Sequence, residues 1–266
     1  MKKRLILILA ALALFLGGCA AQTPIEESQT ETTAAQALCW SDLDFQQEPL
    51  SYAQEFTLAQ AQGYQKLTVG TDQTFLVVPE GAETPTGIPQ EVTVLRQPLQ
   101  NIYMVASASM DYFCKLDALD AIKLSSQKET SWYLPQARQA MEEGRILYAG
   151  KYSTPDYETI LASNCDLAVE NAMIYHTPDV LEQIQHLGIP VLVDRSSYES
   201  HPLGRMEWIK FYGALLNRQQ EARNYYEGLL TSLDPILNEA DTGKTVAFFY
   251  ITASGAVNVR KGTDYI

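Results

Sequence analysis

The sequence predicts an α/β fold in which parallel strands alternate with helices. Residues 145–217 alternate short apolar runs with helix-start signals, and the triplet Thr-Pro-Asp occurs at both 154–156 and 177–179. Strand-length apolar runs separated by helical segments are typical of βαβ units, whose strands form a buried parallel sheet. We therefore expect one complete Rossmann-like α/β lobe over residues 91–217.

Each element of this lobe has a local signal. In both triplets a hydroxyl side chain can cap the helix, proline fits its first turn, and an acid favours the helix dipole. Apolar runs predict strands over 91–95, 101–106, 145–149, 166–170 and 189–194. Helical spacing predicts helices over 110–119, 132–143, from 154, over 177–187 and over 207–216.

Residues 51–90 precede this lobe and read differently. Their first part alternates apolar and polar residues around Gly63 and around the Gly70-Thr71-Asp72 turn, which predicts two or three strands of a meander. Residues 79–89 hold three prolines and form a connector. We interpret 51–90 as an added β element followed by a connector.

The C-terminal part predicts a long helix and the start of a second lobe. Residues 219–238 place apolar side chains at helical spacing, so we assign 218–241 to a bridging helix. Residues 245–252 (TVAFFYIT) predict a strand, with a hairpin or loop returning after it. A strand this apolar is usually central and buried on both faces. We therefore expect residues 242–266 to begin a second lobe, which leaves a two-lobe fold incomplete and C-terminally truncated.

The N-terminus predicts export. Lys2, Lys3 and Arg4 precede an apolar run that ends in Leu16-Gly17-Gly18-Cys19. A basic start, a short apolar core and small residues before the cleavage site define a signal peptide, here residues 1–19. The cysteine resembles that of a bacterial lipobox, which implies a lipid on Cys19. Residues 20–50 are expected to be a flexible tether, because their first part is rich in Gln, Thr, Glu and Ala.

Composition excludes some classes of partner. The formal net charge is −13, with 32 acidic and 19 basic residues. Such a chain has no broad basic face for nucleic acid or for anionic lipid. Cys39, Cys114 and Cys165 allow one disulfide at most, and the chain has no CxxC pair that would indicate a structural zinc site. We expect no cofactor.

The strand pattern also predicts where a ligand binds. In open α/β sheets ligands lie beyond the carboxyl ends of the strands. The loops expected there are residues 107–110, 151–153, 171–176 and 195–201. Tyrosine and arginine in such loops suit a bulky, ring-bearing or anionic chelate. The residues that we expect to contact ligand are Ser109, Lys151, Tyr152, Asn171, Tyr175, Arg195 and Tyr198.

The sequence gives less support to a bare-metal site and to catalysis. His176 and His201 lie in these loops, but a bare zinc or manganese site needs a compact set of His, Asp and Glu, and the chain has three histidines. Asp194, Ser197 and His201 lie within eight residues at one strand end, a spacing unsuited to a catalytic triad. No nucleophile elbow, Walker lysine, HExxH or dinucleotide fingerprint is present, so we expect no enzyme.

The segments KYSTPDYETILASNCDLAVENA and HLGIPVLVDRSSYESHPLGRMEWIKFYGALL resemble the extracytoplasmic substrate-binding lipoproteins of ABC importers for iron–siderophores, haem and vitamin B12. This resemblance implies two α/β lobes bridged by one long helix, with the ligand in the cleft. It implies a permease and an ATPase as partners, and iron–siderophore, haem or corrinoid as ligand. It also implies that Glu158 docks on the permease, with Glu199 and Glu207 as further candidates; Glu207 alternatively pairs with Arg205 or Lys210 on the surface.

One alternative stays open. A truncated chain with a single lobe acts as an interaction module or has no function. In that case the bridging helix and the strand over 246–252 expose apolar side chains, which predicts dimerisation or aggregation. Ligand identity and cysteine pairing are not fixed by the sequence.

Overall fold

The computed structural model describes residues 38–240 and 242–261. The expected signal peptide, Cys19 and tether residues 20–37 lie outside the described residues. Within them, no helix is both long enough and apolar enough to span a membrane.

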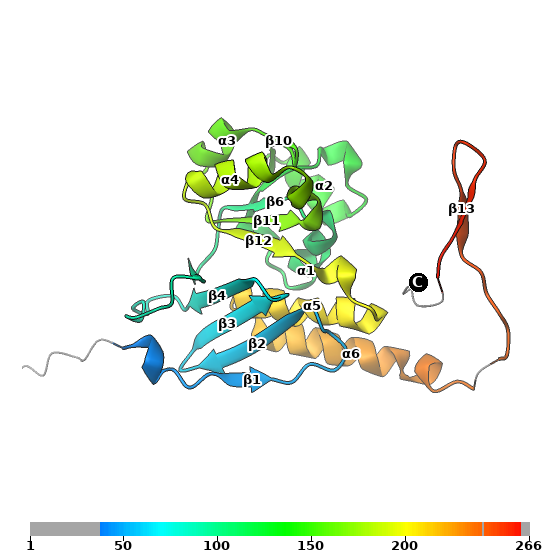
Figure 1. Ribbon diagram of the computed structural model, residues 1–266, viewed down its shortest axis with the longest axis horizontal. Coiled ribbons are helices and arrows are strands. Elements are labelled where there is room, and N and C mark those ends of the chain that lie inside the picture. Colours follow the sequence, from blue (N-terminus) through cyan, green and yellow to red (C-terminus); the bar gives the residue numbers. More distant parts are fainter. Residues whose placement is uncertain (1–37, 241, 262–266) are drawn as a thin grey trace, which may run out of the picture. The chain divides into compact units, whose positions relative to one another are not determined.

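The N-terminal part forms a five-stranded sheet (Figure 1). The first four strands pair antiparallel, and the fifth joins the fourth in parallel. Leu58, Leu67 and Phe75 are cross-strand partners and are all buried, so their face belongs to the core. The meander expected from 51 to 78 is confirmed. In order, the strands are β1 (Gln46–Glu48), β2 (Phe56–Ala61), β3 (Tyr64–Val69), β4 (Gln73–Val78) and β5 (Val92–Arg96).

Two predicted boundaries in this region are wrong. The tether was expected to reach residue 50, but β1 pairs with β2 and Gln46 lies opposite Gln60. The run EVTVL was expected to open the α/β lobe, but as β5 it extends the first sheet, with Val94 opposite Leu76. The two errors have different causes. The residues of β1 are polar and largely exposed, so they carry no strand signal. The alternation in β5 does predict a strand, but it does not say which sheet the strand joins.

The α/β lobe contains a second five-stranded sheet that is wholly parallel. Its spatial order is β12-β11-β6-β7-β8, so the first strand along the chain is central and the order reverses beside it. This is a doubly wound arrangement with a topological switch point between β6 and β11. The expected Rossmann-like α/β class is therefore confirmed. The strands are β6 (Ile102–Met104), β7 (Ile122–Ser125), β8 (Leu147–Tyr148), β11 (Leu167–Asn171) and β12 (Val191–Asp194).

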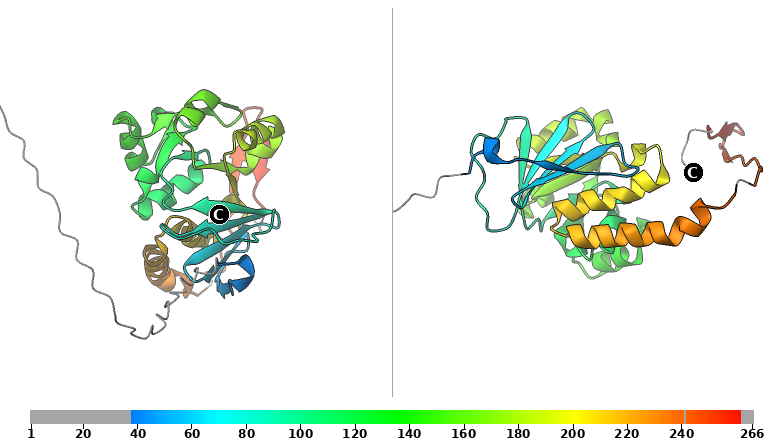
Figure 2. Two further views of the ribbon diagram at one scale, coloured as in Figure 1. Left: turned by 90° about the vertical axis from the view of Figure 1, so that its left-hand side faces the viewer. Right: turned by 90° about the horizontal axis from the view of Figure 1, so that it is seen from below.

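Helices cover both faces of the parallel sheet (Figures 1 and 2). Leu167 and Val169 face a core shared with α1, α2, α5 and the first sheet, whereas Ala168 faces a second cluster under α3 and α4. This alternation follows from the period of two along a strand. The helices are α1 (Met110–Lys115), α2 (Pro135–Glu142), α3 (Tyr157–Ala162), α4 (Pro178–His186), α5 (Pro202–Leu215) and α6 (Gln219–Leu237).

The first Thr-Pro-Asp triplet does not begin a helix in the expected way. Thr154 and Pro155 form β10 (Thr154–Pro155), which pairs with β9 (Gly150–Lys151). The cap of α3 is Asp156, whose carboxylate accepts a bond from the Thr159 N–H at 3.0 Å. The second triplet begins α4 as predicted, with Pro178 in the first turn, although the Thr177 side chain makes no capping bond.

Helix α5 joins the two sheets. It begins at Pro202, earlier than the predicted residue 207, and most of its side chains are buried. Trp208 packs against Phe56 of β2, with ring centroids 4.8 Å apart. At its other end α5 crosses α6 closely, since a side chain at Gly213 would meet the Cβ of Ala222 at 2.5 Å. The right-hand view of Figure 2, from below, shows the two helices side by side.

The C-terminal part forms a hairpin of β13 (Phe249–Ile251) and β14 (Val257–Val259). The expected return strand is confirmed, with Phe249 opposite Val259. The three residues of β13, Phe249, Tyr250 and Ile251, are 61%, 57% and 65% exposed, which is the exposure expected of this strand when no second lobe covers it. β13 pairs only with β14 among the described strands.

Candidate ligand-binding site

The four loops predicted to meet a ligand follow the carboxyl ends of parallel strands. Residues 105–109 follow β6, and residues 172–176 follow β11 on the other side of the switch point. Residues 195–201 follow β12, and residues 149–153 follow β8. Loops on both sides of a switch point leave a crevice in which doubly wound proteins hold ligands.

A buried carboxylate organises the base of this edge. Asp194, the last residue of β12, is 3% exposed. It accepts bonds from the Ser109 hydroxyl at 2.9 Å and the Tyr212 hydroxyl at 2.6 Å. It also accepts from the Ser196 N–H at 2.9 Å and the Ser196 hydroxyl at 2.6 Å. These bonds tie the loops after β6 and β12 to α5, so the rim rests on a fixed base.

The predicted ligand contact by Ser109 is therefore wrong. Its side chain is fully buried and its hydroxyl donates to Asp194. A hydroxyl with no exposed surface cannot contact a ligand at the rim. Its role is to join the loop after β6 to β12.

Arg195 lies among aromatic and acidic side chains at the rim. Its Nε donates to Glu55 Oε2 at 2.6 Å, and its guanidinium lies 5.0 Å from the ring centroid of Tyr198. The bond to Glu55 raises the pKa of Arg195, with further contributions from Asp72 and Tyr175. The structure thus brings together Arg195, Tyr198 and Tyr175, three of the predicted residues.

Two rim residues were missed by the sequence analysis. Glu55 and Asp72 belong to the N-terminal β element, far from the α/β lobe in the sequence. Gly70 allows this approach, because the Arg195 Cδ lies 3.3 Å from where a Cβ would be. No local signal connects a turn at 70–72 with a loop more than a hundred residues later.

The other predicted contacts lie on neighbouring loops. Asn171 caps the short helix over Ala172–His176, where its side-chain oxygen accepts from the Met173 N–H at 2.9 Å. Lys151 is exposed on β9, and Tyr152 packs in part against the second core cluster. Exposed fractions of 46% for Tyr175 and 55% for Tyr198 leave both rings open to solvent. These five residues remain candidates for ligand contact, together with Arg195.

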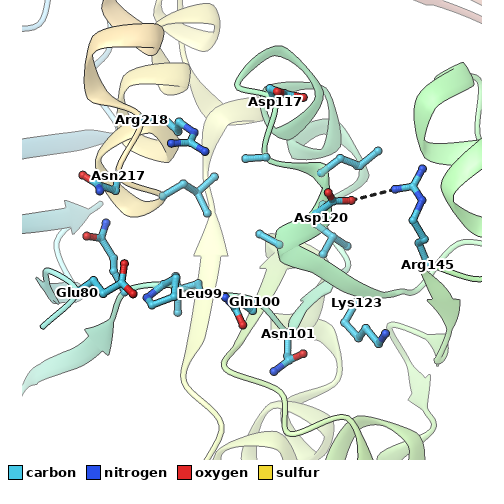
Figure 3. A pocket seen from close by; sticks show the side chains of 17 residues that line it. Glu80, Leu99, Gln100, Asn101, Asp117, Asp120, Lys123, Arg145, Asn217 and Arg218 are labelled. Atoms are coloured by element: carbon cyan, nitrogen blue, oxygen red, sulfur yellow. Dashed lines mark hydrogen bonds and ion pairs between the residues drawn. The ribbon is translucent and has the colours of Figure 1, made fainter.

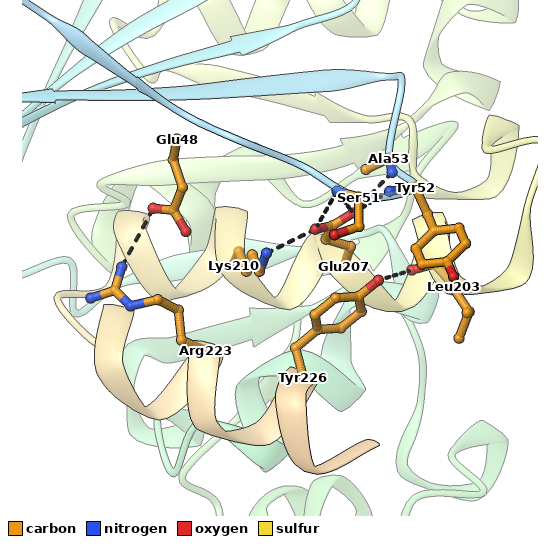
Figure 4. A network of polar contacts seen from close by, with 9 residues as sticks. All are labelled: Glu48, Ser51, Tyr52, Ala53, Leu203, Glu207, Lys210, Arg223 and Tyr226. Atoms are coloured by element: carbon orange, nitrogen blue, oxygen red, sulfur yellow. Dashed lines mark hydrogen bonds and ion pairs between the residues drawn. The ribbon is translucent and has the colours of Figure 1, made fainter. Parts of the chain in front are cut away.

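Glu199 and Glu207 were expected to be docking residues, and the structure contradicts this. Glu207 is fully buried and accepts from the backbone N–H groups of Ser51, Tyr52 and Ala53 at 2.8–3.0 Å (Figure 4). Lys210 donates to it at 2.8 Å, so the expected pairing with Lys210 is present, in the interior and not on the surface. Burial pushes the pKa of Glu207 upward, but Lys210 and the three N–H groups outweigh burial and lower this pKa below its usual value.

Glu199 likewise accepts hydrogen bonds from backbone N–H groups, those of the two residues that follow Ala53. It is 1% exposed and accepts from the N–H groups of Gln54 and Glu55 at 2.9 and 3.1 Å. Trp208 Nε1 donates to it at 2.8 Å. Together Glu199 and Glu207 hold the segment over residues 51–55 on α5, and neither carboxylate is available to a partner protein.

Glu158 keeps the exposure that docking needs. It lies in the first turn of α3 and its side chain faces solvent. An acid at this position also favours the helix dipole by about 0.3–1 kcal/mol. Exposure alone does not separate these two roles.

The structure engages His201 and Asp194 in other contacts. His201 Nδ1 accepts from the Leu203 N–H at 3.1 Å and caps α5, and its ring stacks on Tyr52 at 4.6 Å. Asp194 is engaged with Ser109, Ser196 and Tyr212, as described above. Among the described residues, no group of three or more His, Cys, Asp or Glu side chains is arranged to hold a metal ion.

A cavity of about 660 Å³ lies at the opposite edge of the parallel sheet, beside the amino ends of β6 and β7 (Figure 3). Asn217 and Arg218 at the α5–α6 joint line one side of it, and Asp117 and Asp120 lie across from them. Arg145 is paired with Asp120 at 3.0 Å. This cavity lies at the edge away from the predicted rim, and the switch-point rule does not assign it a ligand.

The chain is similar to known proteins over part of its length. No family model matches the chain. An uncharacterized lipoprotein of Methanocaldococcus jannaschii is 24% identical over 216 residues, which cover 76% of this chain and 51% of that protein. The chain thus spans about half the length of this curated relative.

Several solved structures are also similar. The periplasmic haem-binding protein HutB of Vibrio cholerae is 18% identical with a TM-score of 0.47, covering 59% of this chain and 57% of its own. The petrobactin-binding protein YclQ of Bacillus subtilis is 12% identical with a TM-score of 0.49, covering 62% and 55%. An ABC transporter substrate-binding protein of Listeria monocytogenes is 19% identical with a TM-score of 0.46, covering 62% and 58%.

Proposed function

We propose that the protein is a lipid-anchored, extracytoplasmic solute-binding component of an ABC importer. It captures an iron–siderophore, haem or corrinoid at the rim beyond β6, β11 and β12 and delivers it to a permease. The observation that supports this most is the gathering of Arg195, Tyr198 and Tyr175 at the carboxyl edge of a doubly wound sheet. Chelates and macrocycles combine flat apolar rings with acidic groups, which aromatic faces and a guanidinium bind well.

The arrangement at the rim favours binding over chemistry. Asp194 is buried, and its bonds to Ser109, Ser196 and Tyr212 hold the loops after β6 and β12 in place. His201 is occupied as a helix cap.

The anchor and the partners complete the proposal. The lipobox-like sequence before Cys19 and the lipoprotein relative support attachment to the outer face of the membrane. Glu158 on α3 is the acid that remains available to an arginine of the permease, now that Glu199 and Glu207 are excluded by burial. The permease works with an ATPase that drives import.

Ligand binding tests this function directly. The folded chain is titrated with hemin, a ferric catecholate siderophore and cobalamin, and binding is followed by thermal shift and calorimetry. We expect one class to raise Tm, and Tyr198→Ala or Arg195→Gln to weaken that effect about tenfold or more, which corresponds to about 1.4 kcal/mol. Tyr225→Ala, which removes an exposed ring on α6, is the matched control. Failure of all three classes to bind the folded wild-type chain would refute the proposal.

A second candidate function is that of an interaction module. The specific observation in its favour is the hairpin of β13 and β14, where Phe249, Ile251, Val257 and Val259 are each more than half exposed. An exposed apolar hairpin of this kind favours association with another protein surface. Transport and self-association are separated by the ligand titration above and by the light-scattering measurement described in the Discussion.

A further inference from the structure

Glu170 is a buried carboxyl group without a partner. It is the next-to-last residue of β11, beside the switch point, and its side chain is fully buried. Neither of its carboxyl oxygens has a hydrogen-bond partner. Burial raises the pKa of Glu170 to about 8. A carboxyl group in such surroundings holds its proton, because the charged form would lose its hydration without compensation.

The strand register places Glu170 beside Tyr103. Ala168 lies opposite Tyr103 on β6, and Glu170 is two residues further along the same face of the sheet. This face is the one that α3 and α4 cover. Burial first, and then Glu170, raise the pKa of Tyr103, and Glu170 acts in the same direction on Tyr157 of α3. Glu170 and Tyr103 are therefore both buried on this face, and Tyr157 packs against it with its side chain partly exposed.

Tyr103 connects this space to the rim. Its hydroxyl donates to the Gly150 carbonyl at 3.3 Å, a long bond. Gly150 has φ +83° and packs so tightly that a Cβ would meet the Thr154 carbonyl at 2.5 Å. It begins the turn over residues 150–155, which contains the candidate ligand contacts Lys151 and Tyr152. A tyrosine has one proton to donate, so Tyr103 can satisfy one acceptor at a time.

We infer that Glu170 is a proton-operated latch on the turn over residues 150–155. While Glu170 is neutral, the Tyr103 hydroxyl stays on the Gly150 carbonyl and the turn is held. When Glu170 loses its proton, the carboxylate becomes the stronger acceptor and takes the Tyr103 hydroxyl. The Gly150 carbonyl is then unpaired and the turn loosens. Only the link to ligand uptake rests on the proposed function, through Lys151 and Tyr152.

The surrounding groups favour this exchange. Besides Glu170, the titratable groups that act on Tyr103 are Tyr148 of β8, Cys165 before β11, and Tyr157 of α3. Asp179 of α4 acts on Tyr157. These groups are acidic or neutral, and Lys128 lies over the ring of Tyr148, 5.6 Å from its centroid. Tyr103 is the hydroxyl that the strand register brings to the same face of the sheet as Glu170.

The direction of the pH response follows from linkage. The unfolded or opened chain releases the Glu170 proton near the ordinary value of 4.5, whereas the closed form keeps it up to about 8. The closed turn therefore binds more protons between these two values, and raising the pH favours opening. The latch is closed in acid and released in mild alkali.

Hydrogen exchange of the full chain tests the latch without any ligand. Protection of the amides over residues 150–156, corrected for intrinsic exchange, is compared at about pH 6 and about pH 9. If opening fully hydrates Glu170, wild-type protection falls by roughly one hundredfold. Glu170→Gln, which keeps the shape and cannot ionise, is expected to show the same protection at both pH values. Tyr103→Phe removes the hydroxyl, so these amides are expected to be unprotected at both pH values. Amides of β2 to β4 serve as the internal control.

Two results would overturn the inference. One is an identical pH profile in the wild type and in Glu170→Gln. The other is a carboxyl-carbon NMR titration that places the pKa of Glu170 near its ordinary value, a measurement that needs only the wild-type chain. Since neither experiment involves a ligand, their failure leaves the proposed import function untouched, and failure of the ligand titration leaves the latch untouched.

Discussion

The Gln73 side chain pairs with the backbone of Val193 as an additional strand would. Its Oε1 accepts from the Val193 N–H at 2.7 Å, and its Nε2 donates to the Val193 carbonyl at 3.1 Å. Val193 belongs to β12, the edge strand of the parallel sheet. One amide side chain thus covers the edge of one sheet and fixes the other sheet to it. It also places Asp72 and Glu55 beside Arg195.

Removing this amide is expected to destabilise the junction between the two sheets. Gln73→Ala leaves a backbone N–H and carbonyl of β12 unpaired, at a cost of about 1–3 kcal/mol in the free energy of unfolding. Urea unfolding followed by circular dichroism measures the change. Gln60→Ala, at an exposed position of β2, is the control and should change stability by less than about 0.5 kcal/mol. Equal effects of the two variants would show that the Gln73 bonds add nothing.

The buried anchor made by Glu207 predicts acid sensitivity. Its pKa is lowered in the folded chain, so its contribution is present above the ordinary value of 4.5 and is lost as pH falls through the folded pKa. Glu207→Gln replaces an ionised acceptor of three N–H groups and Lys210, and we expect a loss of about 3–5 kcal/mol at neutral pH. This loss should shrink below about pH 4. Chemical unfolding from neutral to acidic pH measures both, with the exposed Glu227→Gln as control.

The ion pair of Arg195 with Glu55 predicts a gain of affinity. Glu55 occupies the Arg195 Nε at 2.6 Å, so an anionic ligand has to compete with it. Glu55→Gln removes that competition, and we expect acidic ligands to bind up to about tenfold more tightly, by about 1.4 kcal/mol. Arg195→Lys should bind them more weakly, since an ammonium cannot form the two-point contact. Calorimetry with an acidic chelate checks both, and unchanged affinity in both variants would remove Arg195 from the site.

The sequence predicts elements that have a local signal, and it does not predict contacts between distant segments. The parallel strands at 167–171 and 191–194 and helix α4 were predictable, because each follows from a local apolar run or a capped start. β7 was missed, since Ile122–Ser125 offers four residues without clear alternation. The site divides in the same way. Tyr175, Arg195 and Tyr198 follow strand ends that could be predicted, whereas Glu55, Asp72 and Gln73 reach the rim through contacts between distant segments.

Burial likewise could not be predicted from residue type. Glu199 and Glu207 are acids in a chain of net charge −13, and the ordinary expectation places such residues in solvent. They are buried because residues 51–55 present five consecutive N–H groups that no strand satisfies. That these N–H groups require buried acceptors can be recognised only when the segment is seen packed beside α5.

The exposed C-terminal hairpin predicts that this chain associates with itself. Phe249 and Ile251 on β13 are each more than half exposed, as are Ile236 and Leu237 near the end of α6. Each buried side chain of this size contributes about 1.5–3 kcal/mol, so burying several of them between two hairpins favours association. Light scattering of the purified chain should report dimers or larger species. Phe249→Ser with Ile251→Ser should restore a monomer, while Tyr133→Ser, at a position 97% exposed outside this surface, should not. A monodisperse wild-type monomer would contradict the prediction, and it would mean that the apolar residues of the hairpin are covered within the chain.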